Sequence, residues 1–369
     1  MISVDHTTQP GGAELALPRI ARHSRLSWQF AFLEPLTGSL PFDRDASILA
    51  PARPQGLPGQ MLFLARLLRA HPHDLIASNT LRAAVLVAVL KPRGQIHVQL
   101  LRDGVSSDSL SRLKRLASHF VFTRVTKILP NSSWTGRSVP ARFRGLVSAP
   151  IFSPSGTPAG VRTRPSEEVQ DAPLRLLSLS RVVEWKGIHI VLEALSLLAP
   201  QVPSNRIKLT IAGDALMGDQ GYVERLHSAA AALPFEVVFM AHQHDVDPLL
   251  DRHDVLIHAS TRPEPFGQVI VQGLSHGLSV LASRGGGPDD LVRDGETGLL
   301  HEPGDAAGLA ASISLLLAEP HARTLMEEAG ERAAEKFSDI NCVGLLDQQL
   351  SRVMVSCNRC CSPLSPDLA

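Results

Sequence analysis

Short runs of apolar residues alternate along the chain with longer stretches in which apolar residues recur at helical spacing. This alternation is typical of parallel α/β layers, in which a helix follows each buried strand. In the first half, the pattern predicts strands at 2–6, 28–34, 74–78, 95–101, 127–132 and 145–150, and helices at 13–22, 59–70, 80–90, 108–119 and 133–139. In the second half, it predicts strands at 174–180, 207–213, 236–241, 254–260 and 279–283, and helices at 187–199, 221–232, from about 267, 305–318 and 320–336.

The two halves are separated by residues 153–173, which contain four prolines and almost no apolar periodicity, so we expect a linker there. The sequence therefore predicts Rossmann-like domains at 1–152 and 174–340, facing each other across a ligand-binding cleft. Residues 341–369 are expected to form a crossover helix and a tail, with the amphipathic stretch 343–355 packing back across the first domain.

Charge and hydropathy then narrow the classes of function. Lys+Arg and Asp+Glu both number 36, so the overall charge gives no reason to expect binding to nucleic acid. The N-terminus lacks the basic start and apolar run of a signal peptide, and no apolar stretch reaches the length of a membrane span. We expect a cytoplasmic protein, and peripheral contact with a membrane stays open.

All four cysteines, Cys342, Cys357, Cys360 and Cys361, lie in the last 30 residues. No second CxxC or histidine pair completes a metal site, so this pattern favours reduced thiols.

Ligands of open parallel sheets bind at the carboxyl ends of the strands, so the residues after each strand are the candidates for chemistry. Arg181 and Lys186 follow the strand at 174–180 and precede a helix, where two cations could bind a diphosphate. The alternative is a solvated basic turn.

Gly11 and Gly12 open a helix with free backbone N–H groups, which indicates an anion site or simply a tight turn. The three glycines and two acids of SRGGGPDDLV (283–292) indicate either an anion-binding loop or an N-capped helix after a flexible turn.

The stretch RPEPFGQVIVQG (262–273) follows the strand at 254–260. Pro263 and Pro265 restrict the backbone on both sides of Glu264, which aims its carboxylate. If the whole stretch is helical, Glu264 and Gln272 lie two turns apart, at about 12 Å, which suits the two ends of an extended ligand.

Taken together, these stretches resemble retaining glycosyltransferases of family 4, which have the two-domain GT-B fold. The resemblance is close over about 172–340, through SLSRVVEWKG, LTIAGD, RPEPFGQVIVQG and SRGGGPDDLVRDGETGLL. It is looser in the first half, through PGGAELAL (10–17) and ILPNSSWT (128–135).

The resemblance implies roles for individual residues. Arg181 and Lys186 would bind the donor diphosphate, with Glu264 on the donor sugar. Further donor contacts would come from Gly11, Gly12, His242, Phe266, Gly267, Gln268, Val269 and Gln272.

The chain departs from the family pattern at three places. Gln272 replaces the second glutamate of the E-x7-E motif, which removes a charge-assisted bond of about 1–3 kcal/mol at most. Ala241 stands where the family often has glycine. Arg102 and Asp103 stand where many members have a histidine, and His97 is better explained as a packed side chain than as a catalytic one.

The resemblance implies a hexosyltransferase that moves a sugar from a nucleotide-diphosphate sugar, UDP- or GDP-linked, to an acceptor hydroxyl with retention of configuration. We expect no metal and no cofactor besides this co-substrate, because the cations can stabilise the leaving diphosphate. The acceptor would be a glycan, a lipid-linked sugar or a small molecule. Gln272 keeps open a catalytically weakened homologue or partner subunit, and a sugar-nucleotide epimerase is a third possibility.

Overall fold

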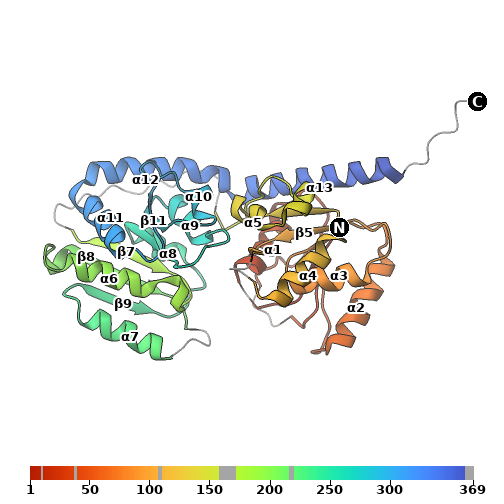
Figure 1. Cartoon of the computed structure of the whole chain (residues 1–369), viewed down its shortest axis with the longest axis horizontal. Helices are drawn as coiled ribbons and strands as arrows, with labels where there is room; N and C mark the ends of the chain where they lie inside the picture. The colour runs from red at the N-terminus through yellow and green to blue at the C-terminus, as the bar shows by residue number, and fades with distance from the viewer. Residues whose placement is uncertain (10, 37–39, 107–109, 158–171, 216–219, 362–369) are drawn as a thin grey trace, which may run out of the picture. The chain divides into compact units, whose positions relative to one another are not determined.

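The computed structural model describes residues 1–9, 11–36, 40–106, 110–157, 172–215 and 220–361, with side chains up to residue 357. The chain divides into two compact units (Figure 1). The first comprises Met1–Ser155 together with Asp339–Ala369, and the second comprises Gly156–Ser338.

The first unit contains a parallel six-stranded sheet in the order β3-β2-β1-β4-β5-β6. Its strands are β1 (Ile2–Asp5), β2 (Gln29–Phe32), β3 (Ser47–Leu49), β4 (Ile76–Ser78), β5 (His97–Leu101) and β6 (Lys127–Pro130). Its helices are α1 (Gly12–His23), α2 (Leu57–Ala70), α3 (Leu81–Leu90), α4 (Arg112–Phe122), α5 (Ser133–Ser138), the 3-10 helix η1 (Ala141–Leu146) and α13 (Asp339–Cys361).

The C-terminal helix α13 is part of the core of the first unit. Its apolar side buries Val343, Leu346 and Leu350 in one cluster with Leu17 and Ile20 of α1. Their spacing of three and four residues places them on one face of the helix. The chain therefore returns to its first unit after completing the second.

The second unit repeats the architecture, with a parallel sheet in the order β12-β11-β10-β7-β8-β9. Its strands are β7 (Leu174–Leu179), β8 (Ile207–Ala212), β9 (Glu236–Met240), β10 (Val255–His258), β11 (Ser279–Ser283) and β12 (Leu299–His301). Its helices are α6 (Ile188–Leu198), α7 (Gln220–Ala231), α8 (Asp247–Asp251), α9 (Gln268–Ser275), α10 (Pro288–Leu291), α11 (Ala306–Ala318) and α12 (Pro320–Ala334), with 3-10 helices η2 (Glu184–Lys186), η3 (Ser204–Arg206) and η4 (Glu335–Phe337).

Strands β10 and β11 lie inside the sheet and are buried along their whole length, VLIH and SVLAS. Such strands read as continuous apolar runs because helices cover both faces of the sheet. The carboxyl end of β10 carries the loop that bears Glu264, and that of β11 carries the triple-glycine segment 285–287.

The predicted strand at 145–150 is wrong. Residues 141–146 form η1, and the only strand-like pairing of this segment is a single bridge between Val147 and Ile128. Pro140 and Pro150 bound the segment, and proline cannot donate to a strand ladder, so only a short piece between them can pair.

Strands β3 and β12 were not predicted. Each has only three residues and is an edge strand of its sheet. Runs this short carry too little alternation to be recognised. Most of the predicted linker lies outside the described residues, while Ser153 and Ser155 at its start are buried in the first unit.

Candidate functional site

The loops after β7 and β10 meet, because these strands are neighbours in the second sheet although about 80 residues separate them. The backbone N–H of Thr261 donates to the carbonyl of Trp185 over 2.8 Å. Gly187 has a φ of 69°, and a Cβ there would lie 1.9 Å from the carbonyl oxygen of Ala259. Only glycine permits this approach.

This approach brings two of the predicted residues into direct contact. The Lys186 ammonium donates to the Glu264 carboxylate over 2.5 Å, and its Nζ also lies 4.2 Å from the centre of the Trp185 ring. The two side chains are only 13% and 14% exposed. Arg181 is on the same loop as Lys186, and its side chain is exposed.

A histidine that the sequence reasoning missed completes this cluster. His258, the last residue of β10, places Nε2 at 3.3 Å from Glu264 Oε2 and at 3.1 Å from Ser260 Oγ. It is 5% exposed. A buried histidine that ends an apolar strand looks like a core residue in the sequence, and its position directly before the site loop was the available signal.

Glu264 is held as an anion. Burial would raise the pKa of its carboxyl, but the Lys186 ammonium and the hydrogen bond from His258 outweigh burial and hold the pKa well below its ordinary value. An anionic carboxylate only accepts hydrogen bonds, so Glu264 is suited to bind hydroxyl groups rather than to donate a proton.

The backbone of Glu264 rests on the triple-glycine segment that follows β11. Gly287 N–H donates to the Glu264 carbonyl over 2.7 Å, and Glu264 N–H donates to the Gly285 carbonyl over 3.2 Å. A Cβ on Gly286 would lie 2.1 Å from the Glu264 carbonyl oxygen, and one on Gly287 would lie 2.1 Å from that of Phe266. These glycines therefore let the two loops pack backbone against backbone, which holds the Glu264 loop in place. The Gly285 N–H donates to the Asp289 carboxylate.

Of the residues that follow Glu264, Phe266 is buried, and Gly267 adopts a φ of 97° just before α9 begins at Gln268. Gln272 lies on α9, whereas Glu264 lies in the preceding loop. Glu264 and Gln272 therefore do not lie on one continuous helix, although the spacing argument assumed that they do. Val269 is in the first turn of α9.

His242 follows β9, and its backbone N–H donates to Asp214 Oδ1 over 2.8 Å. Its ring lies 5.1 Å from that of His244, and both side chains are exposed. In the strand order β10-β7-β8-β9, Glu264 stands at one end of this carboxyl edge and His242 at the other. Three strand spacings, about 14 Å, separate the two positions.

His301 on β12 is also buried, at 5% exposed, and within the described residues neither of its ring nitrogens has a hydrogen-bond partner. Burial, and then the nearby His258, lower its pKa to about 4. His301 therefore stays neutral at physiological pH.

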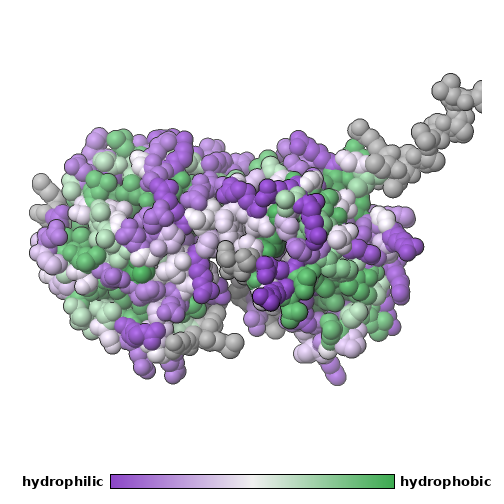
Figure 2. All heavy atoms as spheres, viewed as in Figure 1, coloured by the Kyte–Doolittle hydropathy of each residue, from purple (hydrophilic) through white to green (hydrophobic). Residues whose placement is uncertain are grey.

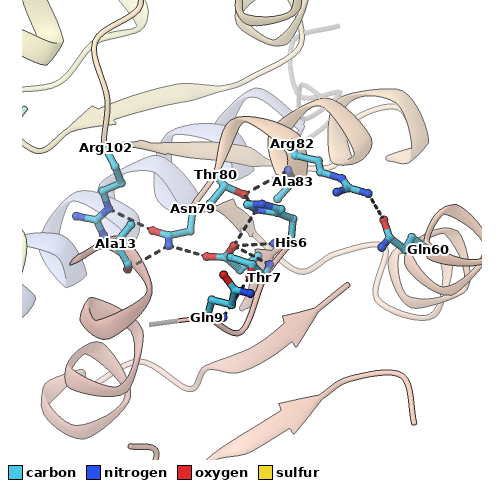
Figure 3. Close-up of polar contacts among 11 residues, drawn as sticks. His6, Thr7, Gln9, Ala13, Gln60, Asn79, Thr80, Arg82, Ala83 and Arg102 are labelled. Carbon is cyan, nitrogen blue, oxygen red and sulfur yellow. Dashed lines mark hydrogen bonds and ion pairs between the residues drawn. The ribbon is translucent and has the colours of Figure 1, made fainter. Parts of the chain in front are cut away.

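The first unit has its own polar cluster at the carboxyl ends of three adjacent strands, β1, β4 and β5 (Figure 3). Buried Asp5 accepts hydrogen bonds from the backbone N–H of His6 over 2.6 Å and from Asn79 Nδ2 over 2.7 Å. Arg102 donates through Nε to Asn79 Oδ1 over 3.2 Å and through Nη1 to Ser153 over 2.5 Å. Burial lowers the pKa of Arg102 to about 10.

His6 is a partly exposed member of this cluster. Its side chain is 30% exposed, and its Nδ1 lies 2.9 Å from Thr80 Oγ1 and 3.4 Å from Asp5 Oδ1. Because a carboxylate only accepts, Asp5 favours the tautomer that carries the proton on Nδ1. Nε2 is then left as a hydrogen-bond acceptor.

Gly11 and Gly12 form the start of α1, with Gly11 as the N-cap. The carboxylate of Glu14 lies over this start, since a Cβ on Gly11 would be 2.6 Å from Glu14 Oε2. Burial and the charge of Asp5 raise the pKa of Glu14. The expected role of the two glycines in anion binding stays a prediction.

His97 is fully buried, as expected, with Nε2 at 2.9 Å from Ser78 Oγ, and burial lowers its pKa to about 3. Cys342 is buried too, and burial raises its thiol pKa to about 12, while the side chains of Cys360 and Cys361 lie outside the described residues. No cluster of metal-ligating side chains occurs in the described parts of the chain. No helix found there is long and apolar enough to cross a membrane.

Residues 162–335 match the family model described as Glycosyl transferases group 1. The lipopolysaccharide core biosynthesis glycosyltransferase LpsE of Rhizobium meliloti is 33% identical over 190 residues, which cover 51% of this chain and 52% of that protein. Spore coat protein SA of Bacillus subtilis is 25% identical over 57% of this chain and 60% of its own length. The chain thus spans about half the length of the curated relatives that it matches.

The crystal structure of Anabaena HepE in complex with UDP-glucose is similar over 96% of this chain and 99% of HepE, with a TM-score of 0.78 and 25% identity. The predicted GT-B fold class and the resemblance to group 1 glycosyltransferases are thereby confirmed.

Proposed function

We propose that this chain, whose residues 162–335 match the model of the glycosyl transferases group 1 family, moves a hexose from a nucleotide-diphosphate sugar to an acceptor hydroxyl. The observation that carries the proposal is the buried pair of Lys186 and Glu264 at the carboxyl edge of the second sheet. UDP-glucose in the HepE complex supports a UDP-linked donor.

The donor would lie along the edge from β10 to β9. Glu264, anionic, accepts hydrogen bonds from the hydroxyls of the sugar. The Lys186 ammonium has three N–H donors and uses one on Glu264. The other two, with exposed Arg181, bind the diphosphate, while the loop of His242 frames the base.

Transfer proceeds with retention and without a metal. The bond from the anomeric carbon to the diphosphate oxygen breaks, and the bond to the acceptor oxygen forms on the same face. The acceptor proton moves to the departing diphosphate oxygen. Lys186 and Arg181 stabilise the negative charge that develops on the diphosphate, and the ion pair with Glu264 holds Lys186 in place beforehand.

His6 in the first unit orients the acceptor through a hydroxyl next to the reacting one, whose own proton goes to the diphosphate. With the proton of the ring fixed on Nδ1 by Asp5, Nε2 accepts a hydrogen bond from this neighbouring hydroxyl. The acceptor is a glycan, a lipid-linked sugar or a small molecule.

The test combines titration calorimetry against UDP, GDP and ADP sugars with release of the nucleoside diphosphate in the presence of candidate acceptors. We expect binding of one nucleotide class, acceptor-dependent release that persists in EDTA, and a product whose anomeric coupling constant matches that of the donor. A product of inverted configuration would overturn retention, and loss of turnover in EDTA would overturn metal independence.

Gln272 supports a second candidate, a nucleotide-sugar-binding subunit with little activity of its own, because the E-x7-E motif ends here in an amide. Donor binding without release by any acceptor would favour this candidate. Conversion of the donor sugar without an acceptor would instead identify an epimerase.

A further inference from the structure

Helix α4 of the first unit exposes a stripe of large apolar side chains. Leu113, Leu116 and Phe120 are 80%, 65% and 41% exposed. Their spacing of three and four residues places them on one side of the helix. Leu113 is the most exposed of the large hydrophobic side chains in the described part of the chain.

This stripe is separate from the side of α4 that holds the helix in place. Val121 and Phe122 are buried in a cluster with Leu101 and Ile128 of the sheet. The helix thus packs on the core through one side, and the apolar residues of the other side have no role in that packing. An apolar stripe of this kind is typical of an interaction surface.

The charges on α4 and on the segment that follows it are all of one sign. Residues 110–157 contain no Asp or Glu, in a chain where acids and bases are equal in number. The same segment contains eight basic residues: Arg112, Lys114, Arg115, Arg124, Lys127, Arg137, Arg142 and Arg144. The neutrality of the chain as a whole therefore conceals a basic region around α4.

Helix η1 adds its arginines to the same surface. The ring of Phe143 packs at 5.5 Å from that of Phe122, and Arg142 Nη2 lies 3.2 Å from His119 Nδ1 of α4. Arg142 and Arg144 are exposed, as are Arg112, Lys114 and Arg124. Figure 2 shows hydrophobic and hydrophilic side chains next to one another over the part of the first unit where Figure 1 labels α4. We call these five basic residues with Leu113, Leu116 and Phe120 the α4 surface.

We propose that the α4 surface binds an anionic lipid membrane, with the apolar stripe in the interface and the basic side chains at the headgroups. A short amphipathic helix with cations beside its apolar side is the arrangement that lies in the plane of such an interface. A nucleic acid would pair with the cations but would leave Leu113 and Leu116 in water. The proposal does not depend on the proposed function.

The test is sedimentation of the full-length protein with phosphatidylcholine vesicles that contain or lack phosphatidylglycerol. We expect binding to the anionic vesicles, weak binding to the neutral ones, and release as salt is added, since exposed charges are screened. Absence of sedimentation with anionic vesicles overturns the proposal, and so does binding to an RNA homopolymer that exceeds binding to the vesicles.

Two sets of variants separate the apolar from the charged contribution. Replacing Lys114 or Arg112 by Gln should weaken partition into anionic vesicles by about fivefold per charge. The double substitution Leu113→Ser and Leu116→Ser should reduce binding by at least as much, without lowering the melting temperature, because neither side chain is in the core.

Matched controls lie elsewhere on the molecule. Leu325 on α12 is 53% exposed, and Arg93, between α3 and β5, is exposed. Leu325→Ser and Arg93→Gln should leave vesicle binding unchanged. Equal losses in these controls, or no loss in the Leu113 and Leu116 variant, would contradict the α4 surface as the membrane contact.

Discussion

Lys186 and Glu264 form an ion pair of 2.5 Å across 78 residues of sequence. They meet because β7 and β10 are neighbours in the sheet and because Gly187 lets the two loops touch. The pair links the residue proposed to bind the diphosphate to the residue proposed to bind the sugar. Each therefore holds the other in position before any ligand arrives.

Replacing Lys186 by Ala should lower transfer at least about 100-fold, since a preorganised charge at the developing anion is lost. It should also lower the free energy of unfolding by about 3 kcal/mol, because a largely buried carboxylate loses its partner. Kinetics and chemical denaturation measure the two effects.

The double variant with Lys186→Ala and Glu264→Gln separates these effects. It should regain much of the stability, since no buried charge is left unpaired, but none of the activity. The exposed pair of Lys208 and Glu236 is the control, and Lys208→Ala should cost less than about 1 kcal/mol. Recovery of activity in the double variant would show that Lys186 acts only through Glu264.

The low pKa of Glu264 predicts how stability depends on pH. Its folded pKa lies below the ordinary value of 4.5, so its contribution is complete above that value and is lost as the pH falls toward the folded pKa. The stability difference between the wild type and Glu264→Gln should thus stay constant near neutral pH and shrink below about pH 4.5. Denaturation curves at a series of pH values test this, and a difference that grows in acid would mean that Glu264 is protonated in the folded state.

The sequence predicted those parts of the site that depend on local pattern. Arg181, Lys186 and Glu264 were recognisable because each lies in a segment that follows an apolar run, and Lys186 and Glu264 also stand beside glycine or proline. The contact between Lys186 and Glu264 was not predictable, because it depends on the strand order β10-β7. That order is set by packing over the whole sheet.

Two further features were hidden for different reasons. His258 and His301 lie in or at the ends of apolar strands, where burial is the simpler explanation of a histidine. The glycines at 285–287 suggested anion binding, yet their main contacts are with the backbone of Glu264 and Phe266, which come from another loop. Close backbone approaches between distant segments leave no local signal.

His258 is expected to position Glu264. Replacing it by Phe removes the 3.3 Å contact and keeps the bulk of the ring, so turnover should fall about tenfold with a smaller change in donor affinity. His276, 4% exposed and paired with Asp251, is the control. His276→Phe should lower stability without lowering turnover of the folded enzyme. An equal fall in turnover in His258→Phe and His276→Phe would show that His258 contributes only to packing.

Gln272→Glu should preserve or raise affinity for the donor, by up to about tenfold, since a carboxylate accepts hydrogen bonds from ribose hydroxyls more strongly than an amide does. Titration calorimetry with the nucleotide sugar measures the change. A large loss of activity in this variant would show that the amide donates a specific hydrogen bond, and that the chain is adapted to glutamine.

His6 is expected to affect the acceptor and not the donor. His6→Phe removes the Nε2 acceptor, so transfer should fall at least about tenfold, while calorimetric affinity for the nucleotide sugar stays unchanged. Asp5→Asn should shift the ring proton away from Nδ1, which 15N spectra of the imidazole detect independently of any acceptor. His71, which pairs with Asp74 at 3.0 Å on the same unit, is the control, and His71→Phe should leave transfer intact. Loss of donor binding in His6→Phe would show that His6 contacts the donor and not the acceptor. Normal transfer in this variant would show that His6 has no role in the reaction.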